Sequence, residues 1–213
     1  MRDVDTVFAL SSDPPREFGV RPRGQTPGSD PGERDLTEHP LSAKTVYRGR
    51  LLDVREDEVR LPDGATARRE YIVHPGAAVM LAMPDAQSVI IERQYRYPLR
   101  EHVYELPAGK IDPGEHPLET AKRELLEETG YRAREWRHLL TTYPVVGYSN
   151  ERIELYLARD LEQVGHALDE GEFLDVIVMP LVDALGWVRL GRIRESKTIM
   201  GLLLADRIVR GEW

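Results

Sequence analysis

The sequence predicts an α+β or α/β sandwich with a small β-hairpin subdomain in front of it. Three observations lead to this prediction: short apolar runs typical of strands recur from Thr45 onward, residues 116–129 change to the period of a helix, and two helical segments close the chain. Hydrophobic residues make up 41% of the 213 residues, which is enough to bury a sizeable core.

Residues 1–42 differ in composition from the rest of the chain. Prolines and glycines are interspersed between Ser11 and Pro40, and the apolar residues there follow neither the period of a strand nor that of a helix. Such a composition is typical of a flexible arm. An arm that docks on a partner subunit is the alternative interpretation.

Residues 43–75 are expected to form the β subdomain. Residues 51–61 have strand character at both ends, Pro62-Asp63-Gly64 is a turn signal, and residues 69–74 form the returning strand. Because an isolated pair of strands is marginal in water, we expect a second copy of the chain to cover this hairpin. The interface would bury Leu51, Val54, Val59 and Leu61.

Residues 76–213 are expected to form the main domain. Its first helix has clear limits, because Pro117 lies in the first turn, where its missing N–H costs nothing, and Gly130 follows the last turn as a C-cap. The apolar run at 77–83 indicates a buried strand, with 88–97 as its hairpin partner. Further strands are expected at 103–106, 136–142, 153–158 and 176–179, and helices at 116–129, 181–190 and 196–209.

Composition excludes several classes of protein. A net charge of −8 argues against a general nucleic-acid binder, and no apolar run approaches the length of a membrane span. The acidic start, Met1 to Asp5, is unlike a signal peptide, and the absence of cysteine fits a cytoplasmic protein. Without thiolates, any metal must bind to oxygen or imidazole ligands.

The helix at 116–129 carries an unusual group of acids. Glu124 and Glu128 project from one face, one turn apart, and Glu127 lies at the edge of that face. Their mutual repulsion would be removed by a divalent cation, and oxygen-only ligands favour Mg²⁺ or Mn²⁺. The alternative is a solvated acidic face in which Arg123 forms i,i+4 ion pairs with Glu119 and Glu127.

The acids belong to a longer pattern that resembles the Nudix box, Gly-x5-Glu-x7-Arg-Glu-U-x-Glu-Glu-x-Gly-U, where U is a bulky aliphatic residue. The resemblance implies a Nudix α/β/α sandwich with a mixed sheet, and hydrolysis of a nucleoside diphosphate linked to another group. The matching residues are Gly109, Glu115, Arg123, Glu124, Glu127, Glu128 and Gly130.

The resemblance also implies roles for these residues. Glu124 and Glu128 fall on the principal metal ligands, and Glu127 on a further ligand or a supporting catalytic carboxylate. Glu115 falls on a carboxylate that ligates or supports a metal, and Arg123 on an arginine that braces the loop.

The segments around the box resemble those of ADP-ribose pyrophosphatases, which are homodimers. Residues 104–109, Tyr-Glu-Leu-Pro-Ala-Gly, are similar to the lead-in in which the alanine carbonyl, here that of Ala108, joins the metal shell. Residues 94–97 and 143–151 are similar to two substrate segments. The substrate-binding candidates are Arg96, which points toward the diphosphate in that family, together with Arg69, Glu105 and Gly147.

The catalytic base is expected in an acidic loop at 169–172. By the same resemblance Glu170 is the base candidate and Glu172 a possible further metal ligand, with Glu151 as the alternative base. The expected reaction splits ADP-ribose into AMP and ribose 5-phosphate by a metal-activated water. Rival functions are hydrolysis of ADP-glucose, GDP-mannose or a nucleoside triphosphate, a non-catalytic ADP-ribose sensor, and a structural protein with a metal-stabilised fold.

Overall fold

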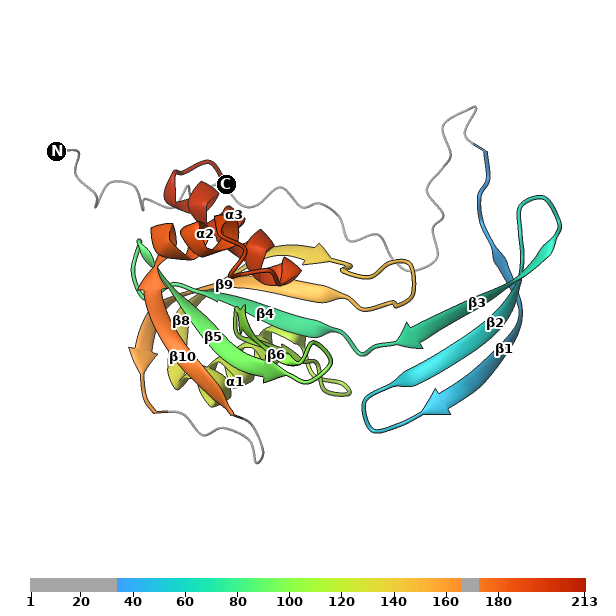
Figure 1. Ribbon diagram of the computed structural model, residues 1–213, viewed down its shortest axis with the longest axis horizontal. Helices are drawn as coiled ribbons and strands as arrows, with labels where there is room; N and C mark the ends of the chain where they lie inside the picture. The colour runs from blue at the N-terminus through green and yellow to red at the C-terminus, as the bar shows by residue number, and fades with distance from the viewer. Residues whose placement is uncertain (1–33, 166–172) are drawn as a thin grey trace. The chain divides into compact units, whose positions relative to one another are not determined.

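The computed structural model describes residues 34–165 and 173–213. The described residues divide into two compact units, one made of residues 34–43 with 57–69, the other of residues 44–56, 70–165 and 173–213. Residues 39–73 supply a three-stranded sheet in the order β1-β2-β3 (Figure 1). Its strands are β1 (His39–Arg48), β2 (Asp53–Arg60) and β3 (Thr66–Val73).

Strand β1 is an addition to the predicted two-stranded hairpin. It begins at His39, inside the segment that was expected to be an arm, and all ten of its residues are exposed. The β-branched and aromatic residues Thr45, Val46 and Tyr47 favour a strand. Pro40 obscured the pattern, although an edge strand such as β1 tolerates a proline. Val59, expected in an interface between copies, is already buried within the chain.

The main body contains two sheets, with strand orders β10-β5-β6 and β7-β4-β9-β8. Strand β4 runs parallel to β9 and antiparallel to β7, so the second sheet is mixed, as predicted. Strand β5 was expected to form a hairpin with β4, and this prediction is wrong: β5 pairs with β6 and β10. The strands are β4 (Ala77–Ala82), β5 (Ser88–Arg96), β6 (Glu101–Glu105), β7 (Ala108–Lys110), β8 (Tyr131–Thr142), β9 (Ile153–Gln163) and β10 (Leu174–Pro180).

Helices cover both faces of the sheets, which confirms the predicted sandwich. Helix α1 (Pro117–Thr129) lies on one side, and α2 (Leu181–Arg189) and α3 (Ser196–Val209) lie on the other (Figure 1). Strand β4 explains why helices are needed on both sides. Its side chains point alternately to opposite faces of the sheet, and every residue of β4 except Ala77 is fully buried.

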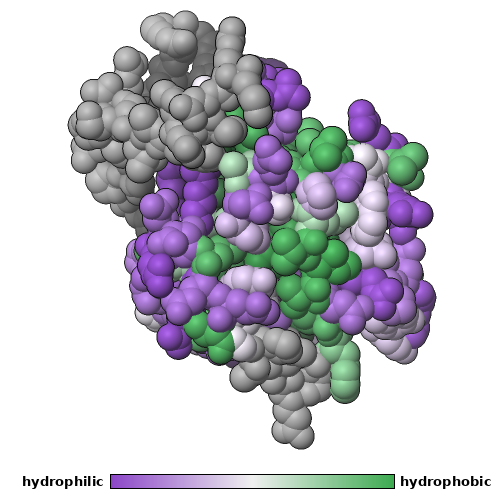
Figure 2. Space-filling model, turned by 90° about the vertical axis from the view of Figure 1, so that its left-hand side faces the viewer, coloured by the Kyte–Doolittle hydropathy of each residue, from purple (hydrophilic) through white to green (hydrophobic). Residues whose placement is uncertain are grey.

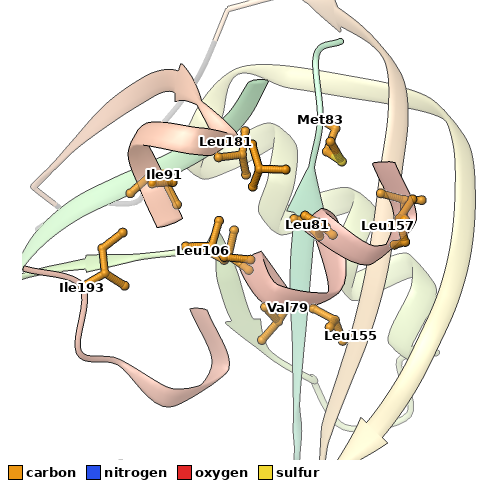
Figure 3. Close-up of a cluster of buried hydrophobic side chains, with 14 of the residues drawn as sticks. Val79, Leu81, Met83, Ile91, Leu106, Leu155, Leu157, Leu181 and Ile193 are labelled. Carbon is orange, nitrogen blue, oxygen red and sulfur yellow. The ribbon is translucent and has the colours of Figure 1, made fainter. Parts of the chain in front are cut away.

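Two hydrophobic clusters divide β4 between them. Val79 and Leu81 pack in the cluster under α2 and α3 (Figure 3), whereas Ala78 and Met80 pack with Leu125 of α1. Burial of each large apolar side chain contributes about 1.5–3 kcal/mol, so β4 is the centre of the fold.

Helix α1 begins and ends where its punctuation predicts. The ring of His116 caps the N-terminus by accepting a hydrogen bond from the N–H of Leu118 at 3.2 Å, and Pro117 is the first helical residue. Gly130 closes the helix in the left-handed conformation, with φ of 73°. These sequence signals predicted both ends of the helix that carries the acids to within one residue.

A hollow of 560 Å³ lies where α2 meets α3, and its lining includes Leu185, Val188 and Leu203. Figure 2 shows hydrophobic side chains gathered near the middle of one face of the molecule, bordered by hydrophilic ones. None of the lining residues belongs to the predicted site. In the part of the chain that the structure describes, no helix is both long enough and apolar enough to cross a membrane.

Candidate active site

The two principal acids of α1 both reach the short strand β7. The backbone N–H of Ala108 donates a hydrogen bond to Oε2 of Glu128 at 3.1 Å. Glu124 lies against Gly109 so closely that a Cβ added at Gly109 would be 1.9 Å from the Glu124 carboxyl carbon. Any side chain at this position would therefore displace the Glu124 carboxylate.

Arg123 connects Glu124 to two further acids, Glu115 and Glu127. Its Nη1 donates to Oε1 of Glu124 and to Oε2 of Glu127, each at 2.9 Å. Its Nε and Nη2 donate to the two oxygens of Glu115, each at 3.1 Å. The predicted pair of Arg123 with Glu127 is present, whereas Glu119 pairs with Lys122 instead of Arg123.

This network alters the acidity of Glu115. The hydrogen bonds from Arg123, followed by that from the Thr120 hydroxyl, lower the pKa of Glu115 from 4.5 to about 2. The same contacts with Glu115, and the charge of Glu124, raise the pKa of Arg123. Glu115 is thus ionised at neutral pH and held by the helix, which fits the bracing role expected of Arg123.

The donor set of this cluster fits a hard cation by its chemistry. Glu124, Glu128 and the carbonyl group of Ala108 offer oxygen alone, and the two carboxylates meet adjacent residues of β7, Glu128 at Ala108 and Glu124 at Gly109. Across residues 34–165 and 173–213, however, no group of three or more acidic or imidazole side chains is arranged to hold a metal ion. Glu170 and Glu172, the predicted base and additional ligand, lie outside the described residues.

Arg96 and Glu105 form a second, separate ion pair. Arg96 Nε donates to Oε1 of Glu105 at 2.6 Å, and its Nη2 donates to Oε2 at 3.0 Å. Burial alone raises the pKa of Glu105, but its bonds with Arg96 and the charge of Lys197 outweigh this effect, so its pKa is lowered. Burial lowers the pKa of Arg96, but the hydrogen bonds and charge of Glu105 raise it by more. The charge of Glu128, on helix α1, raises the pKa of Arg96 to a smaller extent, so Arg96 remains a cation.

Glu105, a predicted substrate-binding residue, is buried, and its contact with substrate stays a prediction. Its side chain is only 5% exposed, and both carboxylate oxygens are engaged by Arg96 and Lys197. Glu105 therefore supports Arg96. Sequence reasoning did not predict the pair of Lys197 with Glu105, because the two residues are 92 positions apart along the chain.

The loop that carries Glu151 lies at the end of the sheet where the box begins. Ala77 pairs with Lys110 on one side and with Ile153 on the other, so β7 and the start of β9 flank the same residue of β4. Oε1 of Glu151 is 3.9 Å from Nδ1 of His74, a neighbour that the sequence did not suggest. Glu151 thus remains a candidate for the base.

The last two predicted residues have different surroundings. Arg69 belongs to the first unit and donates to both oxygens of Glu38, from Nε at 2.8 Å and from Nη2. Gly147 lies in the turn that precedes Glu151, and nothing would lie within 4 Å of a Cβ added there. The turn does not require glycine at this position for space.

Two family models match the chain. The NUDIX domain matches residues 73–199, and the nucleoside diphosphate sugar hydrolase N-terminal domain matches residues 38–72. The second match covers the three-stranded sheet, and the first covers the acids of α1 and Arg96.

Characterised relatives resemble the chain over most of its length. The methanol dehydrogenase activator of Bacillus methanolicus is 38% identical, over 78% of this chain and 90% of its own. The ADP-ribose pyrophosphatase of Bacillus subtilis is 36% identical over the same shares. A crystal structure of an ADP compounds hydrolase superposes with a TM-score of 0.75 at 25% identity, covering 84% of this chain and 98% of the other.

Proposed function

Because the chain belongs to the NUDIX domain family and is a Nudix hydrolase, we propose that it splits the pyrophosphate bond of ADP-ribose to give AMP and ribose 5-phosphate. One observation carries the proposal: Glu124 and Glu128 both lie against β7, and the negative charge of Glu128 also contributes to raising the pKa of Arg96. A cation site and a guanidinium next to each other suit a diphosphate. The likeness to an ADP-ribose pyrophosphatase supports the choice of substrate.

The proposed cofactor is Mg²⁺, with Mn²⁺ as a substitute. Glu124, Glu128 and the carbonyl oxygen of Ala108 would hold it, with Glu115 and Glu172 as supporting or additional ligands. When bound, the metal neutralises charge on the diphosphate and lowers the pKa of a coordinated water. The net charge of −8 does not oppose an anionic substrate, since the bound cations set the local sign.

Side chains of the protein would bind the diphosphate, accept a proton and support the metal ligands. Arg96 would hold diphosphate oxygens, because a guanidinium matches them in a fork. Glu170, or Glu151 if the other loop serves, would take the proton of the attacking water, which is worth about 10² to 10⁴ in rate. Glu127 supports the ligands through its bond with Arg123.

The proposed assembly is a homodimer formed through the N-terminal sheet. Strand β1 exposes Leu41, Val46 and Tyr47, and Leu51 in the next turn is also exposed. Apolar side chains in an edge strand are unusual in a monomer, since such an edge invites pairing. A second copy would cover them through a self-complementary two-fold interface.

Other nucleoside diphosphate sugars are the alternative substrates, since the N-terminal family is described by that class. Initial rates on ADP-ribose, ADP-glucose, GDP-mannose and 8-oxo-dGTP at equal concentration with Mg²⁺ decide between them. The proposal predicts the highest rate on ADP-ribose. A higher rate on any other compound reassigns the substrate, and binding of ADP-ribose without turnover indicates a sensor.

A further inference from the structure

The first turn of α3 holds the segment that leads into β7. Thr198 Oγ1 accepts a hydrogen bond from the N–H of Leu106 at 2.8 Å, and Lys197 Nζ donates to Oε2 of Glu105 at 2.8 Å. Gly201, one turn further, is packed so tightly that an added Cβ would be 2.4 Å from Leu106 Cδ1. Helix α3 is therefore anchored to Glu105 and Leu106, shortly before the residues that meet Glu124 and Glu128.

Lys197 is held at both ends. Glu195, the N-cap of α3, accepts from the backbone N–H of Lys197 at 3.1 Å, and its Oε2 is 3.3 Å from Lys197 Nζ. The Lys197 side chain is only 16% exposed. A lysine that is largely removed from water needs paired carboxylates, and Glu105 and Glu195 provide them.

The same carboxylate that binds Lys197 also orients Arg96. Oε2 of Glu105 accepts from Lys197 and from Arg96 Nη2, while Oε1 accepts from Arg96 Nε. Two contacts from Arg96 and one from Lys197 define the plane of the carboxylate, and that plane defines the direction of the guanidinium. The two hydrogen bonds to Glu105 use Nε and Nη2 of Arg96 and do not involve Nη1.

We propose that Lys197 is a positioning residue that fixes the Glu105 carboxylate and thereby directs Arg96 toward the anionic diphosphate. The identity of the diphosphate rests on the proposed function, whereas the contacts among Lys197, Glu105 and Arg96 do not depend on it. The competing account is that Lys197 only neutralises a buried carboxylate and affects stability alone. The two accounts differ in what they predict for Arg96 itself.

The direct test follows the Nε–Hε signal of Arg96 by NMR, assigned by its disappearance in Arg96→Lys. Lys197→Met should shift this signal and speed its exchange with water about tenfold or more, because a charged hydrogen-bond partner of Glu105 is lost. Lys197→Arg should restore much of the protection. Lys122→Met, which removes an exposed lysine paired with Glu119, is the matched control and should leave the signal unchanged.

An unchanged Arg96 signal in folded Lys197→Met protein would overturn the proposal. Should that variant not fold, Lys197→Gln carries the same test, since it keeps a hydrogen-bond donor without the charge. These readouts need no substrate, so they stand even when the wild-type enzyme proves inactive on ADP-ribose. Such inactivity would contradict the proposed function and leave the role of Lys197 to the NMR result.

Kinetics supply a second readout on active enzyme. Lys197→Met should raise KM for ADP-ribose about tenfold and change kcat less, because Arg96 binds the diphosphate before and during reaction. The effect should disappear in an Arg96→Met background, since Lys197 acts through Arg96. Equal effects of Lys197→Met in both backgrounds would contradict the proposal.

Discussion

Gly109 lies directly beneath the carboxyl group of Glu124, and a Cβ added there would be 1.9 Å from the Glu124 carboxyl carbon. The contact joins a fixed glycine of the box to one of its acids, which lies fifteen residues further along the chain. The contact gives a physical reason for the glycine fifteen residues before Glu124: a side chain at that position would occupy the space of the Glu124 carboxyl group. The first prediction follows from this contact.

Gly109→Ala should remove most of the activity and little of the stability. The colliding atoms belong to the end of a flexible glutamate, so Glu124 can swing away without a shift of the backbone, although its partly buried pair with Arg123 is disturbed. Displacement by about 1 Å can lower kcat about a hundredfold. Gly186→Ala in α2 is the control, because an added Cβ there has nothing within 4 Å. Wild-type kcat in Gly109→Ala would show that the position of Glu124 is unimportant.

Glu124→Gln or Glu128→Gln should lower kcat by several powers of ten while the protein still folds, since each removes a charged ligand from the site. The amide oxygen introduced by Glu128→Gln would still accept the hydrogen bond from Ala108, so β7 should stay in place. The control is Glu119→Gln on the same helix, where the acid is exposed and pairs with Lys122. If either variant kept activity within about threefold of wild type, the ligand assignment would be wrong.

The Glu115–Arg123 network predicts a pH dependence of stability. The pKa of Glu115 is lowered in the folded state, so its contribution is present above its ordinary value of 4.5 and is lost as pH falls through 4.5 toward about 2. Urea unfolding should therefore show Glu115→Gln to be less stable than wild type at pH 7. That difference should shrink as the pH approaches 2, and a difference that stays constant from pH 7 to pH 2 would exclude this linkage.

The base assignment can be tested on both loops. Glu170→Gln should lower kcat with little change in KM, because the group acts in the transition state. Glu151→Gln is the comparison, since Glu151 lies near His74 at the box end of the sheet. If only Glu151→Gln has these effects, the base is in the other loop.

The N-terminal sheet predicts a stable dimer of about twice 24.3 kDa at micromolar concentration, measured by light scattering. Val46→Glu on β1 should convert it to monomer and lower activity, because Val46 is exposed in the chain and would be buried only between copies. Val182→Glu on α2, also at an exposed position, should leave the dimer intact. A fully active wild-type monomer would refute the proposed assembly.

Local signals predicted the parts of the fold that depend on neighbours in sequence. Helix α1 begins at Pro117 and ends before Gly130 because its caps are local, and its acids reach one side because helical spacing puts them there. The pairing of β5 with β10 joins residues about ninety positions apart, such as Ile91 with Ile177, and no local pattern contains it. The tethering of Glu105 by Lys197 escaped sequence reasoning for the same reason.

Helical spacing predicted that Glu124 and Glu128 share one side of α1, but the contacts of other predicted residues depend on partners distant in sequence. Glu105 was predicted to bind substrate, and the structure adds that it is buried and bonded to both Arg96 and Lys197. Arg69 was also predicted to bind substrate, and the structure adds that it donates to both oxygens of Glu38, from a segment expected to be an arm. In both cases a distant partner decides the role, and spacing along the chain carries no signal for it.

Product analysis with ADP-ribose tests the central claim most directly. With Mg²⁺, ³¹P NMR should show ADP-ribose converted to AMP and ribose 5-phosphate in equal amounts, faster than GDP-mannose is consumed. Chelation of the metal or Glu124→Gln should stop the conversion. No conversion of ADP-ribose by folded wild-type protein with Mg²⁺, or conversion that Glu124→Gln leaves intact, would contradict the account.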